Sequence, residues 1–161
     1  MRMVPDSILR HPAQRVRIFS EPLRQLAQDL IDTMYAYDGI GLAAPQIGES
    51  LAVFVANPSK TRGQELVIAN PVLTAPRGRL VETEGCLSIP QLWARVRRAQ
   101  RLRLSGQGLM GESIDVDVQG LLAITCQHEV DHLQGTLFID RLLWFERRRL
   151  RRQLAEPRAC G

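Results

Sequence analysis

Residues 120–134 read GLLAITCQHEVDHLQ, a mostly apolar stretch that carries two of the three histidines in the chain. It contains no proline and is followed by Gly135, so we predict a helix over these residues. At 3.6 residues per turn, His128 and His132 lie on one face, one turn apart, with Glu129 beside them. Two imidazole nitrogens can therefore converge on one metal ion, as in the H-E-x-x-H motif. The alternative is a pair of histidines on a packed helix.

A catalytic metal needs a third protein ligand and one open position. Three cysteines are candidates for that ligand. Cys126 lies two residues before His128, about 200° around the helix, so its sulfur points away from the metal-binding face. Cys160 is the penultimate residue, in a terminal tail. That leaves Cys86, for which a small buried apolar residue is the alternative interpretation.

Hydrolysis is the chemistry that such a site supports. A bound metal ion acidifies a water molecule and polarises a carbonyl group. Glu129 can accept the proton of the water and pass it to the leaving amine. The developing oxyanion needs donors, and the candidates are the side-chain amide of Gln46 and the backbone N–H of Leu87. For Gln46, an ordinary polar loop residue is the alternative.

The remaining sequence predicts an α+β domain. Apolar residues recur at helical spacing over 21–37, which predicts a helix. Residues 39–48 contain too much glycine and proline for a helix interior, and we expect a turn or loop there. Helix, strands and then helices indicate a largely antiparallel sheet. The expected strands are 51–56, 66–70, 81–83, 101–104 and 113–118, with a glycine-rich hairpin connection between the last two and a third helix over 142–155.

Length and charge define one domain with a basic end. The 161 residues, 45% of them apolar, fit a single domain over 1–161. The net charge is +4, but residues 1–140 hold 14 basic and 15 acidic side chains, whereas 141–161 hold seven arginines and two glutamates. The basic character therefore belongs to the predicted C-terminal helix and tail. A solvated surface and a contact with RNA are the two interpretations.

Three cysteines, an odd and small number, argue against a disulfide framework and favour a reducing compartment. No window approaches 18 consecutive apolar residues, and the N-terminus has no apolar core of a secretory signal. We therefore expect a cytoplasmic protein without a membrane partner.

Three segments together carry a resemblance to a known family. GIGLAAPQ at 39–46, EGCLS at 84–88 and QHEVDHL at 127–133 resemble the three signature motifs of the peptide deformylases, in the same order and at similar spacing. The similarity extends from about Val4 to about Asp140, which leaves no room for a transit peptide before the domain. The resemblance implies removal of the formyl group from the N-formylmethionine of nascent polypeptides, with release of formate.

The resemblance also assigns roles to matching residues. It implies that Cys86, His128 and His132 bind one divalent metal ion, Fe²⁺ in many members, with Zn²⁺, Ni²⁺ or Co²⁺ able to replace it. Glu129 becomes the acid and base, and Gln46 and the Leu87 N–H stabilise the oxyanion. The implied fold has antiparallel sheets packed around the metal-binding helix. The C-terminal helix is expected to contact ribosomal RNA, with no role in binding DNA.

The metal-facing side of the helix also suggests a substrate pocket. Leu121, Ile124 and Thr125 precede His128 on the same stripe and would form an apolar pocket for a methionine side chain, although core packing is the alternative. In the family, residues matching Ile40 and Glu84 assist. We expect the peptide to add as a strand along the extended backbone at two glycines, Gly41 and Gly85.

One departure from the family concerns the peptide side of the site. Many bacterial members have an arginine where this chain has Trp93, and Arg95 or Arg97 are candidates to replace it. Two other functions compete with deformylation. A small H-E-x-x-H metallopeptidase would leave Cys86 without a role, and a non-catalytic RNA-binding domain would explain only the basic end.

Overall fold

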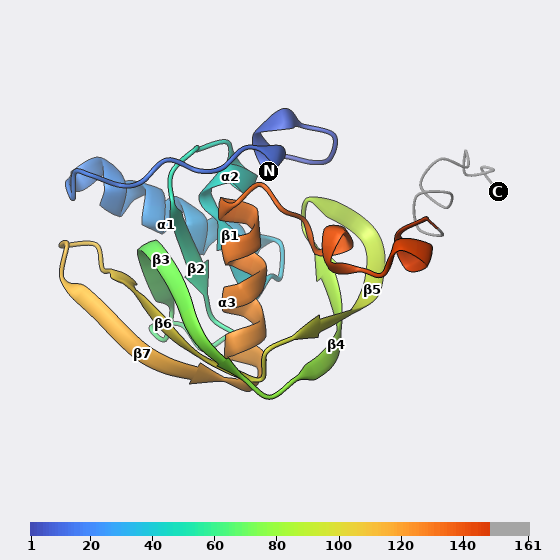
Figure 1. Ribbon diagram of the computed structural model, residues 1–161. Coiled ribbons are helices and arrows are strands. Elements are labelled where there is room, and N and C mark those ends of the chain that lie inside the picture. The colour runs from blue at the N-terminus through green and yellow to red at the C-terminus, as the bar shows by residue number, and fades with distance from the viewer. Residues whose placement is uncertain (149–161) are drawn as a thin grey trace.

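Figure 1 shows a computed structural model of the chain, which describes residues 1–148. A five-stranded antiparallel sheet and a two-stranded antiparallel sheet lie on either side of a central helix. In the described part, helical structure resumes at residues 144–148. The elements in chain order are η1 (Ser7–Arg10), α1 (Glu21–Ala36), β1 (Gly41–Ala43), α2 (Ala44–Ile47), β2 (Val53–Ala56), β3 (Leu66–Arg77), β4 (Leu80–Cys86), β5 (Ile89–Arg98), β6 (Arg101–Gln107), β7 (Ser113–Gln119), α3 (Gly120–Leu133) and η2 (Phe138–Arg141).

The larger sheet, in the order β1-β2-β3-β6-β7, is covered by one helix on each face. Strand β2 is buried along its whole length, and its side chains alternate between the two faces. Val53 and Val55 pack with the apolar face of α1, whereas Phe54 packs in the cluster that contains Ala123 and Val130 of α3. The central helix is thus fixed against the sheet by its apolar residues, while its other side is left for polar groups.

The smaller sheet, β4–β5, covers the other side of α3 (Figure 1). Its inward apolar residues, among them Leu92 and Val96, pack against Leu137 and Phe138, which follow α3 in the chain. Strand β4 ends at Cys86, beside the helix. The chain therefore brings the end of β4 to the polar side of α3.

The predicted α+β class, the central helix and the N-terminal helix are confirmed. The expectation of a loop over 39–48 is wrong, because β1 and α2 occupy most of it, with Pro45 in the first turn of α2, where no backbone N–H is needed. Strand β5 was not expected, because Pro90 and several arginines obscure its alternating pattern. The helix predicted over 142–155 begins at residue 144, and its part beyond residue 148 lies outside the described residues.

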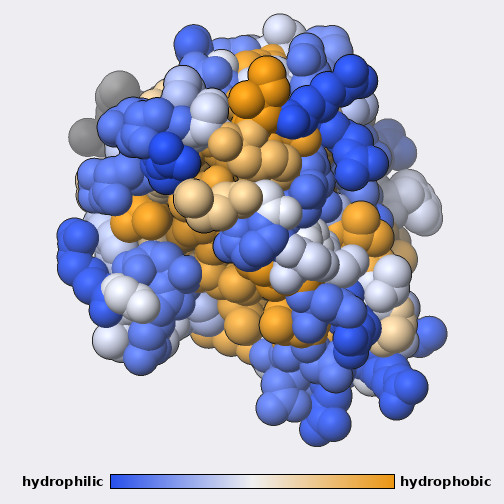
Figure 2. All heavy atoms as spheres, turned by 90° about the vertical axis from the view of Figure 1, so that its left-hand side faces the viewer, coloured by the Kyte–Doolittle hydropathy of each residue, from blue (hydrophilic) through white to orange (hydrophobic). Residues whose placement is uncertain are grey.

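No helix in residues 1–148 is long and apolar enough to cross a membrane. Figure 2 shows the face at the left of Figure 1, where apolar side chains gather in the middle and hydrophilic ones surround them.

Candidate active site

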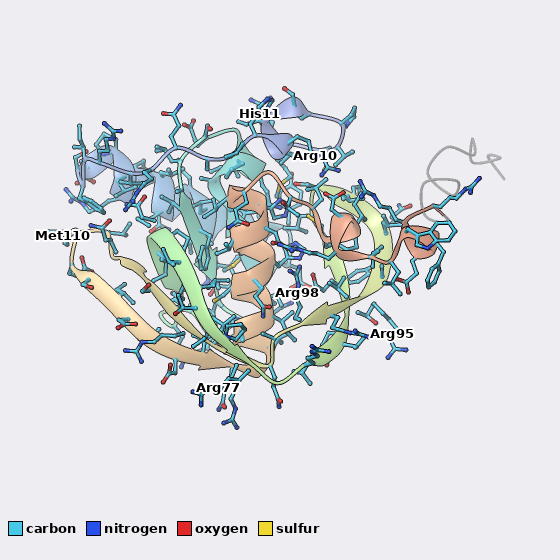
Figure 3. All side chains as sticks on the ribbon, viewed as in Figure 1. Arg10, His11, Arg77, Arg95, Arg98 and Met110 are labelled. Carbon is cyan, nitrogen blue, oxygen red and sulfur yellow. The ribbon has the colours of Figure 1, made fainter. Side chains whose placement is uncertain are left out.

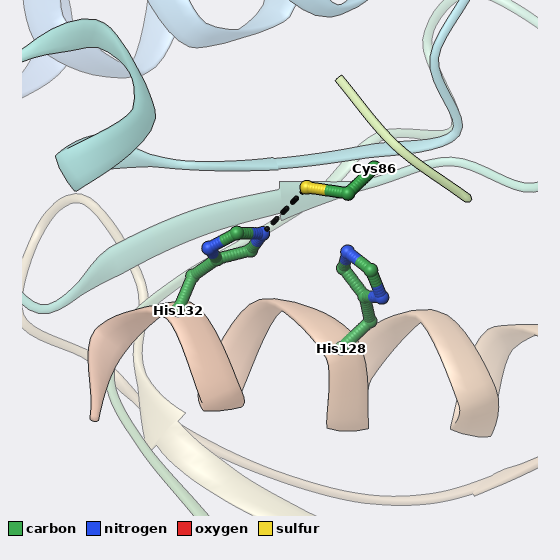
Figure 4. A group of neighbouring side chains, drawn as sticks. All are labelled: Cys86, His128 and His132. Atoms are coloured by element: carbon green, nitrogen blue, oxygen red, sulfur yellow. Dashed lines mark hydrogen bonds between the residues drawn. The ribbon is translucent and has the colours of Figure 1, made fainter. Parts of the chain in front are cut away.

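Two elements bring together the three side chains that the sequence predicts as metal ligands. Cys86 is the last residue of β4, and His128 and His132 lie one turn apart on α3. One ligand atom from each of these residues lies within 4.8 Å of the other two. The Sγ of Cys86 is 3.2 Å from the Nε2 of His132, and both side chains extend from opposite sides into the same space (Figure 4). The fold thus brings the three predicted ligands close enough to share one metal ion.

A buried chain of charges orients His128. The Nδ1 of His128 lies 2.9 Å from the carboxylate of Glu84, so Nε2 is left for the metal site. Arg98 donates to both carboxylate oxygens of Glu84 at 2.8 and 2.9 Å, and to Asp131 at 2.6 Å. Asp131 also accepts from Arg141. Figure 3 shows Arg98 beside α3, whereas Arg77 and Arg95 point outward. A carboxylate behind a ligating histidine fixes the orientation of its ring.

The surroundings set different charges on these groups. Burial alone would raise the pKa of Glu84, but hydrogen bonds from Arg98 and His128 lower it to about 2, so it remains a carboxylate. Burial, reinforced by the neighbouring His128, lowers the pKa of His132 well below its usual value and keeps its imidazole neutral. Burial also lowers the pKa of His128, but Cys86 and Glu84 outweigh it and raise that pKa to about 10.

The donor set fits a transition metal. One thiolate and two imidazoles are ligands that zinc and ferrous iron accept, and three protein ligands leave a position open. Within residues 1–148, the buried Oε2 of Glu129 has no hydrogen-bond partner. Burial raises the pKa of Glu129 to about 7, which suits a group that both takes and gives a proton near neutral pH. The residues present thus match a catalytic metal site.

Gln46 is held so that its amide group faces the thiol. Its Oε1 accepts from the backbone N–H of Ala43 at 2.8 Å. This fixes the side chain and turns Nε2 toward Cys86 Sγ at 3.7 Å and Ser88 Oγ at 3.2 Å. Gln46 is 2% exposed, which excludes the ordinary surface-loop interpretation. Leu87 lies between Cys86 and Ser88 and lines the same cavity.

A cavity of about 670 Å³ opens onto the site. Ile124 and Thr125 are buried in its wall, and Leu121 is half exposed. The carboxylate of Glu84 is hydrogen-bonded to Arg98 and His128. These contacts fit a role in orienting the imidazole of His128. All the predicted substrate residues line the cavity, namely Ile40, Gly41, Glu84, Gly85, Leu121, Ile124 and Thr125.

Cys126 and the residues considered for peptide binding lie at different places in the structure. Cys126 is fully buried in the core on the far side of α3, where burial raises its pKa to about 12. Cys160 lies outside the described residues. Trp93 lines the cavity, whereas the described side chains of Arg95 and Arg97 are exposed and not part of its wall.

Sequence patterns did not indicate Arg98 and Asp131, which extend the hydrogen-bond chain behind the candidate ligand His128. The one usable signal for Arg98 was its place on the inward face of β5, where Leu92 and Val96 are apolar. Asp131 stands inside the H-E-x-x-H motif, but its side chain points to Arg98 and away from the cavity. Arg98 and Asp131 are far apart in the chain, so only the fold brings them together.

Gly41 is the point of closest approach between β1 and α3. A Cβ added at Gly41 would lie 2.4 Å from Oε1 of Glu129 and 2.6 Å from Cγ2 of Thr125. Gly41→Ala must therefore displace the Glu129 carboxylate. We expect kcat/KM to fall about 100-fold, as misplacement by about 1 Å does in other enzymes. Steady-state kinetics of Gly41→Ala and the wild type checks this. A Gly41→Ala variant with the kcat/KM of the wild type would contradict the close approach.

Comparison with known proteins finds a matching family model and similar relatives, all of them deformylases. The family model of polypeptide deformylase matches residues 1–148. A peptide deformylase of Desulfotalea psychrophila is 40% identical over 141 residues, covering 86% of this chain and 83% of that protein. The chloroplastic peptide deformylase 1B of rice is 45% identical over 141 residues, which cover 86% of this chain and only 52% of the rice protein. The chain thus spans about half the length of that relative.

Solved structures of peptide deformylases share the fold of this chain. A crystal structure of a peptide deformylase from Legionella pneumophila matches with a TM-score of 0.89 and 37% identity, covering 98% of each chain. That from Thermus thermophilus gives 0.89 and 40%, covering 95% of this chain and 90% of the other. The chain therefore belongs to the polypeptide deformylase family of metal-dependent hydrolases, which remove the formyl group from the N-terminal N-formylmethionine of new polypeptides.

Proposed function

We propose that Cys86, His128 and His132 hold one divalent metal ion and that Glu129 is the acid and base of deformylation. The observation that carries this proposal is the convergence of the three ligand atoms within 4.8 Å, next to a buried carboxylate oxygen without a partner among residues 1–148. Glu84 and Arg98 keep His128 in the orientation that leaves Nε2 free for the ion.

When bound, the metal supplies a Lewis acid that polarises the formyl carbonyl and acidifies the attacking water. Glu129 accepts the proton of the water at Oε2 and delivers it to the amine nitrogen as the C–N bond breaks, which releases formate and a free methionine amine. The Nε2 group of Gln46 and the backbone N–H of Leu87 donate hydrogen bonds to the carbonyl oxygen as it gains negative charge.

The same cavity accounts for the substrate. We place the methionine side chain against Leu121, Ile124 and Thr125, with Ile40 on the opposite wall. Within the described residues, β1 pairs only with β2, and β4 pairs only with β5, so each offers a free edge. Gly41 and Gly85 lie on these edges and line the cavity. A peptide can therefore pair with the backbone as an added strand, which selects little sequence beyond the first residue.

Release of formate from formyl-Met-Ala-Ser by the metal-loaded protein tests this function. We expect release of formate, and no cleavage of the unformylated peptide Met-Ala-Ser. Cleavage of the unformylated peptide without formate release would instead support a metallopeptidase. A Cys86→Asp variant with unchanged metal content and activity would point the same way, because it would leave the thiolate without a role.

We propose ferrous iron as the physiological metal, with zinc, nickel or cobalt able to occupy the site. A thiolate-bound ferrous site that opens to a cavity is exposed to oxygen. We therefore expect the iron form to lose activity in air within a time over which the nickel form keeps it. Parallel assays of both forms, in air and under argon, measure this difference. Equal stability of the two forms in air would contradict the prediction.

We propose that residues 1–161 act as one cytoplasmic catalytic domain and that its basic end contacts ribosomal RNA. Arg147 and Arg148 lie at the edge of the described part, and 149–161 add four arginines and one glutamate. Leu142 is buried, so a truncation should keep the chain to residue 148. We expect this truncation to weaken ribosome binding in a salt-dependent way and to spare activity on formyl-Met-Ala-Ser. Unchanged ribosome affinity in a sedimentation assay would leave the arginines as solvated surface.

A further inference from the structure

Trp93 occupies the space above Gly85 at the mouth of the cavity. These residues are directly paired between β5 and β4. A Cβ on Gly85 would lie 2.7 Å from Cε3 and Cζ3 of the indole, so the ring covers the place where a side chain of Gly85 would stand. Trp93 is nonetheless 67% exposed and lines the cavity. A large apolar ring is thus held across β4, toward the substrate side, without being buried.

The register of the small sheet determines which side of a bound peptide Trp93 faces. Glu84 and Ala94 are paired, and the Glu84 side chain points toward His128 on α3. Successive side chains of a strand point to opposite faces, so Trp93 lies on the face directed away from α3. In the proposed function, the peptide lies beside β4 with its methionine side chain toward α3. The side chain of the next peptide residue must then point to the face that carries Trp93.

We propose that Trp93 is a specificity-determining residue that recognises a large apolar or aromatic side chain at the second position of the formylated peptide. This inference rests on the proposed function of the cavity. Because Gly85 has no side chain, nothing on β4 separates the indole from a peptide residue across the strand. Edge-to-face and offset-stacked aromatic pairs are favourable, and aliphatic side chains also gain contact with the ring.

The other groups at the cavity mouth favour the same class of side chain. Tyr37 and Met3 line the cavity and are about half exposed. Lys60, the single lysine of the chain, is paired with Asp38 at 2.6 Å. Arg95 is exposed two residues from Trp93 on the same face, where it would repel a basic side chain. The exposed Glu82 also lines the cavity, but it lies on the face of β4 that carries Glu84, opposite the face of Trp93. On the Trp93 face, an apolar or aromatic second residue therefore suits the surface better than a basic one.

The test compares kcat/KM of the nickel-loaded enzyme for formyl-Met-Phe-Ser and formyl-Met-Ala-Ser. We expect the wild type to prefer the phenylalanine peptide about two- to tenfold, the range of measured aromatic pair energies. Trp93→Ala should bring this ratio close to one, and Trp93→Phe should keep most of it. Trp144→Ala is the matched control, because Trp144 is the other tryptophan, is exposed and is not part of the cavity wall. It should keep the wild-type ratio.

A second readout measures contact directly. In a Trp144→Phe variant, Trp93 is the single fluorophore of its kind, and the product peptide Met-Phe-Ser should change its emission more than Met-Ala-Ser does. An unchanged ratio in Trp93→Ala, or a wild-type preference for formyl-Met-Glu-Ser over the phenylalanine peptide, would overturn the inference while leaving deformylation intact. Absence of formate release from every peptide would overturn the proposed function itself, together with the inference that rests on it.

Discussion

Glu129→Gln lowers kcat/KM for formyl-Met-Ala-Ser by about 100- to 10,000-fold, the usual contribution of a positioned acid and base. Glutamine keeps the size and shape of the side chain but cannot take up the proton of the water. Burial raises the pKa of Glu129 to about 7, and its Oε2 has no partner among residues 1–148, so the lost group is the one free to exchange a proton. The activity is measured on protein loaded with one equivalent of nickel.

Two measurements make this result specific. Metal content should match that of the wild type, since Glu129 is not one of the three ligands. Glu49→Gln changes an exposed carboxylate outside the cavity and should retain full activity. If Glu129→Gln kept more than about a tenth of the wild-type kcat/KM, Glu129 would not be the acid and base.

Arg98→Met lowers the free energy of unfolding by about 3–5 kcal/mol, the cost of breaking a buried ion pair by removing one partner. Arg98 is 5% exposed and lies between two buried carboxylates, those of Glu84 and Asp131. Methionine fills a similar volume, so the cost comes from the lost charge: the buried Glu84 keeps only its contact with His128, and the buried Asp131 keeps only the partly exposed Arg141. Urea unfolding at a fixed nickel concentration measures the change.

Arg103 provides the matched control, because it also bridges two aspartates, Asp115 and Asp117, but on the exposed face of the large sheet. Solvent screens such pairs, so Arg103→Met should change the unfolding free energy far less. Similar losses of unfolding free energy in the two variants would contradict the conclusion that the buried ion pairs of Arg98 stabilise the fold. The Arg98→Met variant should also bind the metal more weakly, because Glu84 no longer has the partner that holds it against His128.

The elements with a strong local pattern could be predicted from the sequence. The helix α3 was predicted because its spacing places His128 and His132 one turn apart, and α1 was predicted from its apolar periodicity. Helix geometry sets Cys126 aside and Cys160 falls in the terminal tail, so Cys86 remains the candidate third ligand, and the resemblance to the peptide deformylases gives it that role. Cys126 does lie in the core. Local periodicity was sufficient for the two helices because it acts over a few residues, whereas the role of Cys86 needed the comparison with a family.

Features that depend on distant partners were not predicted. Strand β5 is defined by pairing with β4, and its arginines break the apolar alternation that marks a strand. The partners of Glu84 could not be predicted for the same reason: the resemblance placed this residue beside the substrate, and only the fold shows that its carboxylate is held by Arg98 and contacts His128. The short α2 within the Gly- and Pro-rich segment positions Gln46, and only the packed fold shows which way that amide points.

Titration of the metal-free enzyme with nickel, followed by formate release from formyl-Met-Ala-Ser, tests the metal centre most directly. Activity should rise linearly and level off at one equivalent. Cys126→Ala should give the same curve, because that cysteine lies in the core, whereas Cys86→Ala should show little activity at one equivalent. Full activity without added metal, a break at two equivalents, or a Cys86→Ala curve identical to that of the wild type would contradict a single catalytic ion held by Cys86, His128 and His132.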